Sequence, residues 1–238
     1  MVSVSELKAT VAQVNAKGRA SLEAAHGIAL EPTATTSDII DNIVKIPPLQ
    51  YVSSVEGLYY GAMLPEGAEL VVYLPEHHNL SDMFRECKEL KKVKLIGNEI
   101  LFPVSLDNTF NQCQNLEEVD FTEYALLIQQ MSACFNMCKS LVRILGEFDL
   151  TGYLNQSLVF LQLNKLQEIR LKKGSASVNL TLAQSPMLSE KSVESIVEGL
   201  ATLEPEQARN LKLNSAVVAK ITDQQRSTIY SKGWTLVE

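Results

Sequence analysis

A short repeat, led in each copy by a phenylalanine, constrains the fold of this chain more than any other feature. Three copies share the pattern Phe-x2-Cys-x2-Leu, followed three residues later by Val or Ile. A fourth copy keeps this frame with a leucine in place of the cysteine. The copies begin at Phe84, Phe110, Phe135 and Phe160, so they follow one another at a nearly constant interval. A period of roughly two dozen residues predicts stacked units rather than one closed globule.

Each copy combines two local patterns. The three-residue steps from Phe through Cys to Leu suit a helical or 3₁₀-like turn, where every third residue returns to one side. A two-residue step then places two apolar side chains on one face of a strand. The patterned positions are Phe84, Cys87, Leu90, Val93 and Leu95; Phe110, Cys113, Leu116, Val119 and Phe121; Phe135, Cys138, Leu141, Ile144 and Gly146; Phe160, Leu163, Leu166, Ile169 and Leu171. One unit cannot bury its apolar face alone, so we expect stacked units with a parallel sheet.

This frame resembles the bacterial surface-antigen (BspA-like) type of leucine-rich repeat over roughly residues 70–172. Gly146 in a strand position and the slightly longer, less regular units depart from that family's pattern. The resemblance implies an α/β (α+β) solenoid, a leucine-rich-repeat stack with short parallel strands. It also implies an adhesive or interaction role without catalytic activity.

The segments on either side of the repeat divide the chain into three parts. We expect a helical N-terminal module at 1–48, the leucine-rich-repeat region at 49–185 and a C-terminal capping unit at 186–238. A capping box at Ser3 and Glu6 and an apolar stripe predict the first helix, and a second helix ends before Pro47. This module resembles short N-terminal segments of phage and prophage tail-associated proteins. The alternative is an ordinary helical cap on a solenoid.

The C-terminal part carries the signals of a terminal unit. Apolar residues at helical spacing over 193–200 predict an amphipathic helix, and Leu211-x-Leu213 predicts a strand. Thr222 and Gln225 form a second capping box, and Trp234 begins a last strand after Gly233. This run resembles the unit that follows such repeats in gut-bacterial and prophage proteins. It would cover the open end of the core.

Charged residues flank the strand positions in register across the copies. In-register parallel strands lie ~4.8 Å apart, so we expect each charge to face an opposite charge on the next strand. Two interpretations stay open: a polar surface that recognises a ligand, or a self-neutralised ladder in which each exposed pair contributes at most ~1 kcal/mol. The candidate interaction face comprises Lys92, Lys94, Glu118, Asp120, Arg143, Glu168 and Arg170.

The sequence predicts no catalytic residues, no cofactor and no metal site. Cys87, Cys113, Cys134 and Cys138 form no Cys-x2-Cys pair, and the repeat places three of them at core positions, so we expect buried free thiols. A cysteine-dependent enzyme using Cys87 with His77 or His78 is a remote alternative. It conflicts with the exposed, electropositive setting that a catalytic thiol needs.

Charge and hydropathy restrict the partners. The chain has 238 residues with 28 acidic and 21 basic side chains, a net charge of −7 that argues against nucleic acid. No apolar run approaches the ~20 residues that span a bilayer, and no signal peptide is seen. We therefore expect a cytoplasmic or virion/tail-associated protein, or a cell-surface protein if the chain given lacks its leader.

Two non-enzymatic functions fit these observations. The first is binding of a protein or cell-surface ligand, in adhesion or as a tail-associated component of a phage or prophage. The second is an intracellular scaffold or binding module unrelated to phage. Residues 1–48 are the candidate contact for a homo-oligomer in the first case.

Overall fold

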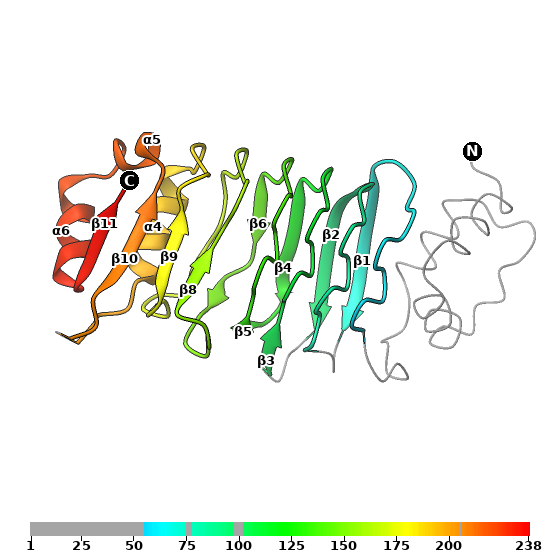
Figure 1. Cartoon of the computed structure of the whole chain (residues 1–238), viewed down its shortest axis with the longest axis horizontal. Helices are drawn as coiled ribbons and strands as arrows, with labels where there is room; N and C mark the ends of the chain where they lie inside the picture. Colours follow the sequence, from blue (N-terminus) through cyan, green and yellow to red (C-terminus); the bar gives the residue numbers. More distant parts are fainter. Residues whose placement is uncertain (1–54, 75–77, 98–101, 205) are drawn as a thin grey trace, which may run out of the picture.

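The computed structural model describes residues 55–74, 78–97, 102–204 and 206–238. Within these ranges the chain is an α/β structure with short strands in three sheets and few helices. Every strand pairing recorded there is parallel. The strands follow one another along the long axis of the molecule, and the helices gather at the C-terminal end (Figure 1). The helical module predicted for 1–48 lies outside the described residues.

The three sheets divide the chain between them. The first has the order β1-β2-β4-β6 and contains β1 (Ala68–Leu74), β2 (Leu90–Gly97), β4 (Glu118–Tyr124) and β6 (Arg143–Leu145). The second has the order β3-β5-β7 and contains β3 (Pro103–Ser105), β5 (Leu126–Gln130) and β7 (Phe148–Asp149). The third has the order β11-β10-β9-β8 and contains β8 (Ser157–Val159), β9 (Asn179–Leu182), β10 (Arg209–Leu213) and β11 (Trp234–Val237).

Equivalent positions of successive copies pair with one another in the first sheet. Val93 lies opposite Val119, and Val119 lies opposite Ile144. All three side chains are buried, as the two-residue step predicts. The repeat in the sequence is therefore a repeat of strand pairing in space.

The first aromatic residue of each copy stacks on that of the next. The ring centroids of Phe84 and Phe110 are 5.3 Å apart, those of Phe110 and Phe135 are 5.5 Å apart, and the planes within each pair differ by 3°. Tyr59 stacks on Phe84 at 5.1 Å and 5°. Tyr59 precedes Phe84 by one repeat length, so the stack contains one more unit than the sequence pattern predicted.

The turn that carries each aromatic residue is not helical, so the prediction of a helical or 3₁₀-like turn is wrong. Hydrogen bonds do span three residues, as from the amide of Cys87 to the carbonyl of Phe84 at 3.0 Å. However, φ is positive two residues before and two residues after the aromatic position, at +55° in Asp82 and +62° in Glu86. The unit is a succession of β-turns with left-handed third residues, which no continuous helix contains.

The C-terminal unit has the predicted elements. Helix α4 (Glu190–Gly199) is followed by β10, α5 (Ser215–Val218), α6 (Asp223–Ser231) and β11. Thr222 and Gln225 form the expected capping box at the start of α6. Trp234 is buried, and its indole nitrogen donates a hydrogen bond to the carbonyl of Ala201 at 2.9 Å. Among the described helices, none combines the length and the apolar character needed to cross a bilayer.

Candidate functional site

The structure brings the predicted charged residues of β2, β4 and β6 onto neighbouring strands. Lys92 lies opposite Glu118, and Glu118 lies opposite Arg143. An isolated bridge continues this row from Arg143 to Glu168. In a second row Lys94 lies opposite Asp120. We call these residues, together with Arg170, the charged strand face.

Most charges on this face are paired with carboxylates nearby. Arg143 contacts Glu118 with 2.5 Å between Nε and Oε2. Arg170 lies 2.8 Å from Glu168 on its own segment, rather than facing a charge on the next unit. Lys94 lies 3.9 Å from Asp120. The expectation of opposite charges in contact is thus met across neighbouring strands for Glu118 and Arg143, and only loosely for Lys94.

Two carboxylates that the sequence reasoning missed complete the pairing. Glu69 on β1 lies 2.7 Å from Lys92, and Glu123 at the end of β4 bonds Lys94. Hydrogen bonds to Glu69 and to Glu123 raise the pKa values of Lys92 and of Lys94, respectively. Glu69 belongs to the unit that begins at Tyr59, but the spacing of the later copies would place Gly67 opposite Lys92, because this unit has two more residues between its aromatic residue and its strand.

The predicted buried free thiols are confirmed. All four cysteines are free and buried. Burial raises the pKa of Cys87 to about 12, and a hydrogen bond joins its thiol to the carbonyl of Tyr59 at 2.9 Å. A nucleophilic cysteine requires the opposite, a lowered pKa and access to solvent. His77 lies outside the described residues, and the ring of His78 contacts that of Phe102 at 5.3 Å.

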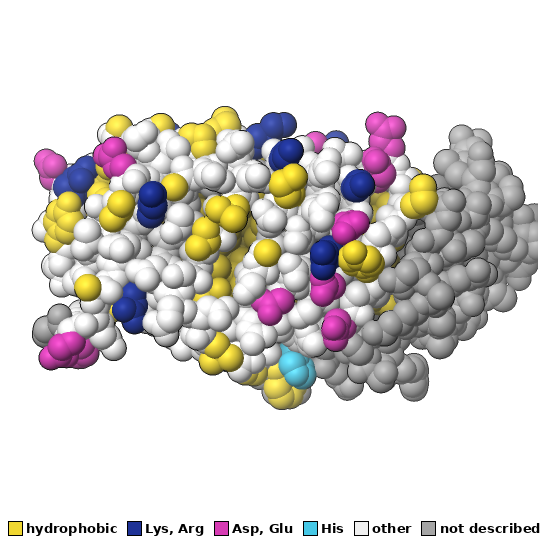
Figure 2. Space-filling view, viewed as in Figure 1, with side chains coloured by type: hydrophobic (Ala, Val, Ile, Leu, Met, Phe, Trp, Pro, Cys, Tyr) yellow, Lys and Arg dark blue, Asp and Glu magenta, His cyan; other side chains and the backbone are white. Residues whose placement is uncertain are grey.

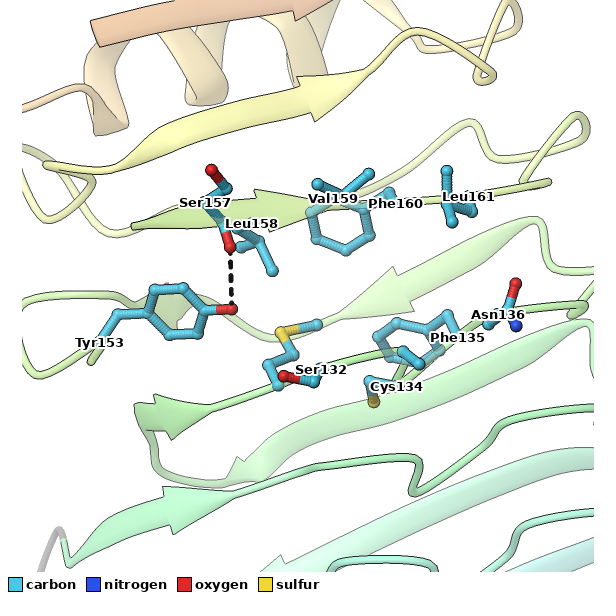
Figure 3. Close-up of a pocket in the computed structure, with 12 residues that line it drawn as sticks. Ser132, Cys134, Phe135, Asn136, Tyr153, Ser157, Leu158, Val159, Phe160 and Leu161 are labelled. Carbon is cyan, nitrogen blue, oxygen red and sulfur yellow. Dashed lines mark hydrogen bonds between the residues drawn. The ribbon is translucent and has the colours of Figure 1, made fainter. Parts of the chain in front are cut away.

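A cleft separates the turn around Phe135 from strand β8. Its volume is about 260 Å³. Apolar side chains are gathered in a hollow in this part of the surface (Figure 2), and the residues that line it are drawn in Figure 3. We call this site the 135–160 cleft; it is lined by Met131, Ser132, Ala133, Cys134, Phe135, Asn136, Tyr153, Ser157, Leu158, Val159, Phe160 and Leu161.

The sequence reasoning missed the 135–160 cleft. Phe135 and Phe160 are separated by one ordinary repeat length, so the spacing carries no sign of a break.

In the part of the chain that the structure describes, no group of three or more His, Cys, Asp or Glu side chains could hold a metal ion. Comparisons of the chain with protein-family models, curated proteins and solved structures find no match.

Proposed function

We propose that the chain is a leucine-rich-repeat solenoid of the BspA-like type that binds a protein or cell-surface ligand and performs no catalysis. The biological setting we propose is adhesion, or a tail-associated role in a phage or prophage. The observation that carries the proposal is the repeated unit of one aromatic turn and one parallel strand in the copies led by Tyr59, Phe84, Phe110 and Phe135, whose stacked rings continue to Phe160. Such stacks present extended surfaces that other proteins use for binding.

The charged strand face is the surface we propose for this contact. Its ion pairs are partly exposed, with 49% of the Arg143 side chain and 37% of the Lys92 side chain accessible. Exposed pairs of this kind contribute at most ~1 kcal/mol each. Their side chains can therefore exchange an internal partner for a charge on a ligand at little cost. The preferred ligand surface would carry alternating charges with the spacing of adjacent strands.

The Glu118→Lys variant tests this face. The change places three positive charges in one row, Lys92, the new lysine and Arg143, and removes the partner of Arg143. Labelled full-length protein would be applied to intact bacterial cells and to a protein array. We expect Glu118→Lys to weaken the binding found with wild-type protein at least ~10-fold.

The matched control is Glu194→Lys, the same charge change at an exposed position of α4. It should bind as the wild type does. Unchanged binding by Glu118→Lys, with only a small loss of stability, would mean that the charges neutralise one another on the sheet and bind no ligand.

The oligomeric state separates the tail-associated setting from an intracellular scaffold. A trimer in sedimentation equilibrium that dissociates in Leu7→Asp and Val11→Asp variants would support the tail-associated role, because both residues lie in the predicted apolar stripe. A monomeric wild-type chain would support the scaffold instead.

A further inference from the structure

A regular row of backbone hydrogen bonds joins the aromatic turns of successive units. The amide of Tyr59 donates to the carbonyl of Met83 at 2.8 Å, and the amide of Phe84 donates to that of Thr109 at 2.9 Å. The amide of Phe110 donates in the same way to the carbonyl of Cys134 at 2.9 Å. In each case the acceptor is the residue just before the next aromatic position.

This row stops at the 135–160 cleft. The equivalent acceptor for the amide of Phe135 is the carbonyl of Val159, and no hydrogen bond joins them. The rings of Phe135 and Phe160 are 6.5 Å apart with planes that differ by 16°, a wider and less parallel contact than in the preceding pairs. Beyond the cleft, the amide of Phe160 donates to the carbonyl of Thr181 at 2.9 Å, which continues the pairing of β8 with β9.

One wall of the cleft therefore carries backbone donors without acceptors. Among the described residues, the amides of Ala133 and Phe135 donate no hydrogen bond, and both residues line the cleft. The amide of Met137, just beyond the lining residues, also donates none within the described part of the chain. These three amides are spaced at two-residue intervals along the turn. On the opposite wall, the hydroxyl of Tyr153 donates to the carbonyl of Ser157 at 3.4 Å (Figure 3). A backbone amide without a partner in the chain is free to donate to a ligand, so this wall favours a group that accepts hydrogen bonds.

The rest of the lining is mainly apolar. Phe135 and Leu158 are buried along the walls, whereas Val159 and Leu161 at the rim are 43% and 44% exposed. The volume of about 260 Å³ is below the ~300–1,000 Å³ typical of pockets that enclose a small-molecule ligand. It matches one large apolar side chain that enters from a partner.

We propose that the 135–160 cleft binds a peptide segment of a partner protein. One aromatic or large aliphatic side chain of the segment enters the cleft, and the backbone carbonyls of the segment accept hydrogen bonds from the amides of Ala133 and Phe135. In the preceding unit the equivalent amides of Asn108 and Gln112 donate to backbone carbonyls, so polypeptide backbone is a ligand that fits such a row. Main-chain hydrogen bonds of this kind are a general source of affinity in peptide recognition. This site goes beyond the proposed function, because it does not involve the charged strand face.

The probe for this proposal is a library of random peptides displayed on phage and selected on the full-length chain. We expect the selected peptides to share one aromatic or large aliphatic residue. Leu161→Asp should weaken their binding at least ~10-fold, because it places a carboxylate at the apolar rim. The matched control is Met187→Asp, a change at a residue that is 49% exposed and does not line the cleft. It should leave the affinity within about twofold of wild type, as surface changes away from an anchor do.

Hydrogen exchange provides a readout that needs no variant. In the free chain the amide of Phe135 should exchange faster than the amides of Phe84 and Phe110, and a selected peptide should slow it. Equal protection of all three amides in the free chain would overturn the proposal, because the cleft would then be closed. Selection of no peptide, or equal binding to Leu161→Asp, would also overturn it. So would a dimer that Leu161→Asp dissociates, since a second copy would then occupy the cleft.

Discussion

The thiol of Cys113 donates a hydrogen bond to the backbone carbonyl of Phe84, with 2.9 Å between sulfur and oxygen. The same carbonyl accepts the amide of Cys87 at 3.0 Å, which closes the β-turn of its own unit. The carbonyl of one unit thus accepts two hydrogen bonds, one from an amide of its own turn and one from the thiol of the next unit. Cys138 and Phe110 repeat this relationship at 3.0 Å. The recurring cysteine therefore links units through a hydrogen bond as well as through packing.

The first prediction concerns the reactivity of these thiols. Burial raises the pKa of Cys87 and of Cys138 to about 12, so both stay protonated at pH 8.5, where a free cysteine is about half ionised. We expect iodoacetamide to label the described cysteines at least ~100-fold more slowly in the native chain than in guanidinium chloride, as read by mass spectrometry. Rapid labelling of Cys87 in the native chain would instead support the alternative that the chain is a cysteine-dependent enzyme.

The second prediction concerns the aromatic stack. Phe110 is fully buried and contacts the rings of Phe84 and Phe135. Phe110→Ala should lower the free energy of unfolding by about 3–5 kcal/mol, because it removes a large side chain and both ring contacts. Urea denaturation measures this loss. The control Tyr230→Ala, at a residue that is 53% exposed, should change stability by no more than about 0.5 kcal/mol.

The sequence was sufficient to predict the stacked strands, because spacing alone identifies which side chains share a face. It was not sufficient to predict the turns. Three-residue steps fit a 3₁₀ helix and a series of β-turns equally well. The left-handed positions also hold residues such as Glu86 and Ala133 rather than glycine. The copy at Tyr59 could not be recognised from the repeat pattern, because its cysteine position holds Ala62 and its leucine position holds Pro65.

The candidate sites were predictable to different degrees for a related reason. The rows of the charged strand face follow from register, which spacing determines. The direction of a long side chain does not follow from register, and Arg170 bonds Glu168 on its own segment. At the 135–160 cleft the rings of Phe135 and Phe160 are further apart and the hydrogen bond between their turns is missing, although the sequence spacing of the two residues is regular.

The third prediction concerns Gly146, which interrupts the apolar pattern of the third copy. Gly146 has φ of +103°, and a Cβ atom there would lie 2.9 Å from the Cβ of Phe121. Gly146→Ala therefore adds a steric clash to the backbone strain. Gly174→Ala is the matched control, because Gly174 has φ of +67° and no atom within 4 Å of the added carbon.

We expect the control to lose about 1 kcal/mol from strain alone. Gly146→Ala should lose about 1–3 kcal/mol more, because Phe121 is buried and cannot move freely. Thermal unfolding of both variants measures the difference. Equal losses would show that the backbone near Phe121 relaxes, and that the pattern departs at Gly146 because of φ alone.

The last prediction concerns the dependence of stability on pH. The carboxylate of Asp149 accepts hydrogen bonds from the amide of Thr151 at 3.0 Å, from its hydroxyl at 2.6 Å, and from Lys172 at 2.7 Å. Burial alone would raise the pKa of Asp149, but these hydrogen bonds and the charge of Lys172 hold it below its ordinary value. The folded chain thus binds this proton less tightly than the unfolded chain does.

Linkage gives the sign of the effect. The stabilisation by Asp149 is fully present above the ordinary carboxyl pKa of ~3.9 and is lost as the pH falls through the lower pKa of the folded chain. Asp149→Asn should therefore lower the free energy of unfolding by about 1–3 kcal/mol at pH 7, and by progressively less as the pH falls below ~4. Denaturation at a series of pH values measures both, with Glu147→Gln at a neighbouring exposed position as the control. A loss that stays constant, or grows, as the pH falls would show that the Asp149 side chain stabilises the fold by packing and not by its charge.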